Sequence, residues 1–200
     1  MTLVRKVRTL SVDQVARTWF WERSDPTRAA RTQLRELASR GLVRLSPAMS
    51  YDELAFPAPL ALWRPGSELP NFAQLAERLL RRWPDVLRPV TLVNATPAGA
   101  AWCGGTRPRP SRPSEVSHDL SLAALYLMFR QSDKARANAW VAESTLQAEG
   151  YGKPGGYLPD AALRGSDGET LLELAGVYSE EKLLGMHRFA AFHGVPYEVW

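Results

Sequence analysis

Apolar residues in the first part of the chain recur at helical spacing in two neighbouring segments. A Ser-x-x-Gln capping box at Ser11 opens the first segment and predicts a short helix that ends near Phe20. The second segment begins with Asp25 and Pro26, which are typical of a helix start, and reaches Gly41, which is typical of a helix end. Because few residues separate the two segments, we expect the helices to turn sharply against each other.

The second predicted helix, residues 25–41, separates apolar and cationic side chains onto opposite faces. Ala30 and Leu34 mark the packing side. The polar side carries Arg28, Arg31, Thr32, Arg35 and Ser39. Two interpretations are open for this polar side, which is either an ordinary solvated arginine face or a surface that contacts a polyanion.

The residues after Gly41 predict a strand at 42–45, a polar loop, and a second strand at 60–64. Helix, helix, strand, loop and strand is the element order of a winged helix. In that fold the second helix lies in the major groove of DNA and the hairpin contacts the backbone. The pattern therefore predicts double-stranded DNA as the partner, with Arg44 of the hairpin joining Arg28, Arg31, Thr32, Arg35 and Ser39.

The middle of the chain predicts a third amphipathic helix from Phe72 to Trp83, then a strand at 90–95 and a short helix at 96–102. The apolar side of the third helix either covers its own domain or forms a homodimer contact. Residues 104–114 are rich in Gly, Pro and Arg without periodicity, and predict a linker whose arginines can meet phosphate. We therefore expect a winged-helix domain at 1–103, a linker at 104–114 and a second domain at 115–200.

The second half of the chain has the pattern of an α/β unit. A mostly apolar helix is expected at 118–130, strands at 139–143, 157–163 and 170–175, a helix at 180–192 and a final strand at 196–200. The order is αβββαβ. Together with the first half, it predicts an α+β protein of two domains.

Charge is distributed unevenly along the sequence. Residues 1–113 hold 18 Lys and Arg against 9 Asp and Glu, whereas residues 114–200 hold 7 against 12. A basic first half suits a polyanionic partner. A single cysteine, no signal-peptide core and no apolar run of roughly 20 residues favour a cytoplasmic protein that contacts no membrane.

Two carboxylates in the second half have the placement of a metal site. Asp160 opens one predicted strand and Glu173 lies in the next, so a short turn between them brings both acids together, as a hard divalent cation requires. An αβββαβ core with Pro-Asp and a later Glu-x-Lys is similar to the PD-(D/E)XK nucleases, in which the acids hold Mg²⁺ and the lysine positions water. This chain has Ala175 at the lysine position. By that resemblance, Lys182 is a candidate displaced catalytic lysine and Glu143 a candidate third ligand.

Across most of residues 10–200, the chain also resembles the bacterial replication-relaxation family. The resemblance rests on a winged-helix pattern and on short motifs. These motifs are Thr96 to Gly99, His118 to Leu120, Trp140 to Glu143, Pro159 to Ala161, Leu172-Glu173 and Glu181 to Leu183. Members are associated with the replication of plasmids and mobile elements and with its control. The resemblance implies DNA binding more firmly than it implies DNA cleavage.

These observations predict a sequence-specific DNA-binding protein that regulates transcription or plasmid-type replication, associated with the nucleoid or a plasmid. No cofactor is expected for this function. The first alternative is a Mg²⁺-dependent endonuclease of the PD-(D/E)XK type, and the second is a protein-interaction adaptor. No nucleotide-binding loop or hydrolase motif supports nucleotide hydrolysis or acyl transfer.

Overall fold

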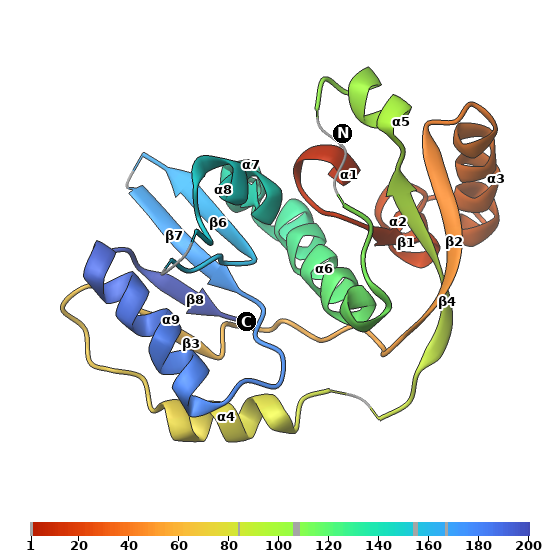
Figure 1. Ribbon diagram of the computed structural model, residues 1–200. Helices are drawn as coiled ribbons and strands as arrows, with labels where there is room; N and C mark the ends of the chain where they lie inside the picture. Colours follow the sequence, from red (N-terminus) through yellow and green to blue (C-terminus); the bar gives the residue numbers. More distant parts are fainter. Residues whose placement is uncertain (1, 84, 106–108, 154–155, 167) are drawn as a thin grey trace. The chain divides into compact units, whose positions relative to one another are not determined.

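The computed structural model of the protein describes residues 2–83, 85–105, 109–153, 156–166 and 168–200, and has an α+β fold (Figure 1). Its contacts divide the chain into two units, each built from two separate stretches of sequence. Unit 1 comprises residues 1–53 and 84–127, and unit 2 comprises residues 54–83 and 128–200. Within the described residues, no helix has the length and apolar composition of a bilayer-spanning segment.

Unit 1 combines helices with a three-stranded antiparallel sheet of order β1-β4-β2. Its elements are α1 (Thr2–Arg5), β1 (Leu10–Ser11), α2 (Val12–Trp19), α3 (Pro26–Ser39), β2 (Val43–Ser50), β4 (Arg88–Ala95), α5 (Pro97–Trp102), the 3₁₀ turn η1 (Pro113–Glu115) and the start of α6 (Val116–Ser132). The predicted capping box is confirmed, with Ser11 Oγ accepting from the Gln14 N–H at 3.0 Å. Asp25 caps α3 in the same way, and Gly41 follows the helix with φ at 69°.

The predicted pairing of the strand at 42–45 with the strand at 60–64 is wrong. β2 pairs along its whole length with β4, whereas residues 61–63 form β3 (Ala61–Trp63) in the sheet of unit 2. Trp63 explains this assignment, because its large side chain is buried in the core of unit 2 and stacks on Tyr197 with ring centroids 5.6 Å apart. Local sequence pattern indicates a strand but carries no information about which strand it pairs with.

Unit 2 is built on a five-stranded sheet of order β3-β8-β7-β6-β5, in which only the pair β7 and β8 runs parallel. Its strands are β3, β5 (Trp140–Ala142), β6 (Ala161–Gly165), β7 (Gly168–Glu173) and β8 (Tyr197–Val199). Its helices are α4 (Phe72–Leu80), the end of α6, α7 (Lys134–Ala139), α8 (Glu143–Glu149) and α9 (Glu180–His193). The predicted αβββαβ order is therefore present, with α7 and α8 added around β5.

The helix α4 packs against α9 within unit 2. Phe72, Leu75 and Leu79 on its apolar side are all buried, and this removal of apolar surface from water stabilises the packing. Of the two interpretations of this helix, the structure supports cover of its own unit, because the aromatic side is already occupied. The homodimer remains a prediction.

The units differ from the predicted division at both boundaries. Residues 54–83 belong with unit 2, and α6 joins the two units instead of opening the second. Arg109 and Arg112 of the predicted linker form ion pairs with Glu115 while their side chains stay exposed, and Arg107 lies outside the described residues. Unit 1 contains 14 Lys and Arg and 9 Asp and Glu, whereas unit 2 contains 11 Lys and Arg and 12 Asp and Glu.

Candidate nucleic-acid interface

The polar side of α3 is fully open to solvent. Arg28, Arg31, Thr32, Arg35 and Ser39, the basic face of α3, are all exposed. On the opposite side Ala30 and Leu34 are buried, with 0% and 5% of their surface exposed. Packing on one side thus fixes the rotation of the helix, and it directs the arginines away from the core.

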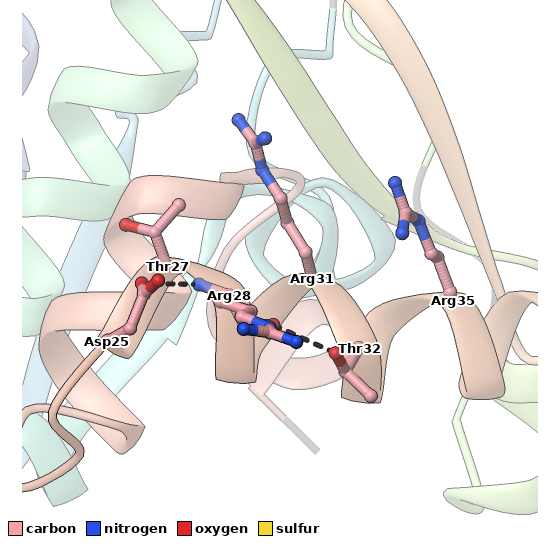
Figure 2. Close-up of a pocket in the computed structure, with 6 residues that line it drawn as sticks. All are labelled: Asp25, Thr27, Arg28, Arg31, Thr32 and Arg35. Carbon is pink, nitrogen blue, oxygen red and sulfur yellow. Dashed lines mark hydrogen bonds between the residues drawn. The ribbon is translucent and has the colours of Figure 1, made fainter.

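A shallow cavity of about 440 Å³ lies along the basic face of α3, lined by Asp25, Thr27, Arg28, Arg31, Thr32 and Arg35. Figure 2 shows Arg31 and Arg35 projecting on the same side of the helix, with Arg28 pointing in a different direction beside Thr32. Three guanidinium groups and one carboxylate line this surface, which suits an anionic partner more than an apolar one.

Among the described residues, the arginines on the basic face of α3 have no carboxylate partner. Within the part of the chain that the structure describes, no carboxylate lies within 4.0 Å of the guanidinium groups of Arg28, Arg31 or Arg35. Elsewhere arginines form ion pairs with acids, namely Arg8, Arg17, Arg88, Arg109, Arg112, Arg136 and Arg164. The positive charge of α3 is therefore left uncompensated on one exposed face.

The three other predicted contact residues differ in what they can offer. The hydroxyl of Thr32 donates to the Arg28 carbonyl at 3.0 Å, and that of Ser39 donates to the Glu36 carbonyl at 2.8 Å. Both hydroxyls have thus used their donor and retain acceptor capacity. Arg44 is exposed on β2, opposite Asn94 of β4, and its place on the strand next to the end of α3 fits the predicted backbone contact.

Contacts from the start of α5 hold the turn that follows the C-terminal end of α3, and the sequence did not predict these contacts. Thr96, at the start of α5, donates its hydroxyl to the Gly41 carbonyl at 2.5 Å, and its backbone N–H donates to the Leu42 carbonyl at 3.2 Å. A Cβ at Gly99 would lie 2.0 Å from that Leu42 oxygen, so only glycine lets α5 approach so closely. The Thr96-Pro-Ala-Gly99 segment therefore holds the turn that follows the basic face.

In unit 2 the predicted carboxylates lie at one end of the sheet. β5 ends just before Glu143, β6 begins just after Asp160, and β7 ends at Glu173; antiparallel pairing brings these ends together. Asp160 Oδ2 accepts a hydrogen bond from the Leu174 N–H at 2.9 Å. Glu173 is 3% exposed and accepts from the Tyr178 hydroxyl at 2.5 Å. Both acids thus bind protein donors.

Lys182, from the first turn of α9, lies against the same cluster. Its ammonium group is 3.2 Å from the centroid of the Tyr178 ring. Burial lowers the pKa of Lys182, and the charges of Glu173 and Asp160 oppose that shift. Burial also raises the pKa of Tyr157 and Tyr178, and the charge of Glu173 adds to both shifts. Both tyrosines belong to the cluster. The predicted strand at 157–163 includes Tyr157, whereas the structure begins β6 at Ala161, and Tyr178 lies after β7.

The predicted metal ligands Asp160, Glu173 and Glu143 have different surroundings in the structure. Among the residues that the structure describes, no group of three or more Asp, Glu, His or Cys side chains is placed to hold a metal. Asp160 and Glu173 are bound to a backbone N–H and a tyrosine hydroxyl, and Glu143 is half-buried at the start of α8. Ala175 is completely buried in the core of unit 2, so a lysine there would need to enter an apolar environment.

Comparison of the chain with protein-family models, with curated proteins and with solved structures found no match. The basic face of α3 and the carboxylate cluster of unit 2 are therefore interpreted from their own geometry.

Proposed function

We propose that the protein binds double-stranded DNA through α3, which enters the major groove, and that it regulates transcription or plasmid-type replication in the cytoplasm. The single observation that carries this proposal is the uncompensated basic face of α3, where three exposed arginines share one side of a helix whose other side is buried. Arginine favours bidentate contacts with phosphate and with guanine, and burial of Leu34 keeps the face directed outward.

The surrounding architecture supports the same proposal. Two helices, α2 and α3, are followed by the antiparallel pair β2 and β4, an order that agrees with a winged helix in which the connection between the two hairpin strands is unusually long. The resemblance of the sequence to the replication-relaxation family points to the same class of partner. Exposed Arg44 on β2 then serves as a backbone contact.

A fluorescence-anisotropy titration with duplex DNA at several salt concentrations tests the proposal. We expect wild-type affinity to fall steeply with salt, and the Arg28, Arg31 and Arg35 triple alanine variant to lower the salt slope by up to about three units. The matched control replaces three exposed arginines of unit 2, Arg64, Arg78 and Arg188, by alanine and should leave the slope unchanged. If the α3 triple alanine variant bound DNA with the affinity and salt slope of the unit 2 control variant, the proposal would be contradicted. If the wild-type protein bound no duplex DNA, the adaptor function would be favoured.

An endonuclease is retained as a second candidate function, because Lys182 lies within electrostatic reach of Asp160 and Glu173. Incubation of supercoiled plasmid with the protein and Mn²⁺ tests it directly. We expect no cleavage above background and equal DNA affinity in Asp160→Ala, Glu173→Ala and Lys182→Ala. Metal-dependent nicking by the wild type, lost in Asp160→Ala, would overturn this expectation and establish the endonuclease.

A further inference from the structure

We propose that Arg31 and Arg35 read two G·C base pairs about two base-pair steps apart in the major groove, while Arg28 and Arg23 hold the DNA backbone at the start of α3. The inference rests on the proposed function, and it goes further by assigning base preference to one pair of arginines and positioning to another. It predicts which DNA sequences are bound, which the basic charge alone does not determine.

The base-reading pair is selected by its spacing and direction. Residues four apart in a helix lie about 6 Å apart along its axis, and successive bases along one DNA strand are separated by about 3.4 Å. Figure 2 shows the Arg31 and Arg35 side chains projecting from the same side of α3. Within the described residues no carboxylate competes for either guanidinium group, so both forks are open to the O6 and N7 acceptors of guanine.

The positioning pair lies at the turn before α3. A second depression of about 430 Å³ includes Arg23, Asp25, Arg28 and Thr32 among its lining residues. It lies at the N-terminus of a helix of 14 residues, where backbone N–H groups favour an anion. Asp25 also faces this depression, and its Oδ1 accepts from the Arg28 N–H at 2.9 Å as the helix cap. Arg28 and Arg23 therefore flank this depression, and the Arg28 side chain points in a different direction from those of Arg31 and Arg35 (Figure 2).

The remaining side chains of α3 favour guanine over adenine. Adenine is read by the amide groups of Asn or Gln, and the basic face of α3 contains neither. The single glutamine of the helix, Gln33, donates its amide to Glu36 at 3.3 Å. The hydroxyls of Thr32 and Ser39 donate to the backbone of α3. Arginine is thus the one bidentate base-reading side chain that this face presents.

The first experiment selects bound duplexes from a pool with a randomised central region, using the full-length protein. We expect enriched sites to contain two G·C pairs two steps apart. Replacing either guanine by 7-deazaguanine, which lacks the N7 acceptor and still pairs with cytosine, should weaken binding by about 5- to 150-fold. Enriched sites without guanine, or equal affinity for the 7-deazaguanine duplex, would overturn the inference.

Lysine variants separate base reading from charge. Arg31→Lys and Arg35→Lys keep the charge but replace the planar two-nitrogen fork by a single ammonium group. They should therefore retain the salt slope and show a smaller 7-deazaguanine effect than the wild type. The matched variant Arg28→Ala should lower the salt slope by about one unit and keep the guanine preference. A 7-deazaguanine effect of undiminished size in both lysine variants would contradict the inference while leaving the proposed function intact. Absence of binding to any duplex would overturn both.

Discussion

Replacing Gly99 by alanine tests whether α5 fixes the end of α3. The added Cβ would lie 2.0 Å from the Leu42 carbonyl oxygen and 2.9 Å from its carbon, and both are backbone atoms that cannot rotate away. The Thr96 N–H donates to the same Leu42 oxygen at 3.2 Å, and the Thr96 hydroxyl donates to the neighbouring Gly41 carbonyl at 2.5 Å. The helix α5 must therefore move by about 1 Å, and that movement weakens both hydrogen bonds.

The magnitude follows from two contributions. Overpacking against structure that cannot relax costs about 1–3 kcal/mol, and each weakened hydrogen bond adds up to about 1 kcal/mol. We expect the Gly99→Ala variant to lose roughly 2–4 kcal/mol of its free energy of unfolding. A domain stability of about 5–15 kcal/mol makes this a large fraction, although the variant should still fold. Binding of DNA should weaken as well, because the turn after α3 is displaced.

Urea unfolding followed by circular dichroism measures the change, with Gly185→Ala as the matched control. Gly185 lies inside α9, and a Cβ there has no atom within 4 Å. The same substitution should therefore stabilise the protein at this position, by about 0.5–1 kcal/mol. Opposite signs for the two variants are expected. If Gly99→Ala were as stable as the wild type, the close approach of α5 to the Leu42 carbonyl would be refuted.

Two further predictions concern buried and paired acids. Tyr178→Phe removes the hydroxyl that donates to Glu173, and should destabilise the protein by about 1–3 kcal/mol in the same unfolding assay, whereas an unchanged urea midpoint would mean that the bond is absent. Hydrogen bonding to Arg109 lowers the pKa of Glu115 to about 2, so its stabilising contribution is complete above its ordinary pKa of 4.5 and is lost as the pH falls toward 2. Glu115→Gln should flatten the pH dependence of the unfolding midpoint over this range, and a parallel profile would contradict that assignment.

Local signals in the sequence predict α2, α3, α4, α5, α6 and α9, but they do not predict α1, α7 and α8. The caps at Ser11 and Asp25 act over three residues, so they depend little on the rest of the fold. The exposed and buried sides of α3 also follow from the sequence, because helical period fixes which residues share a side. The basic face of α3 is thus a feature that the sequence predicts and the structure retains.

Features that depend on distant partners could not be predicted. The strand at Ala61–Trp63 is recognisable from its residues, yet its pairing with β8 is decided by burial of Trp63 beside Tyr197. The contact of Tyr178 with Glu173 joins a residue of the segment after β7 to the last residue of that strand. Such pairings need the three-dimensional packing, since no periodic pattern marks them.

The placement of residues 54–83 in unit 2 has a consequence for the order in which the protein can fold during synthesis. The ribosome makes β2 first, then the whole segment with β3 and α4, and only afterwards β4, which completes the sheet of unit 1. β3 must in turn wait for its neighbour β8, which is made last of all the strands. Neither sheet can therefore close in a simple N-to-C sequence, and β3 emerges from the ribosome as an exposed apolar strand long before its partner exists.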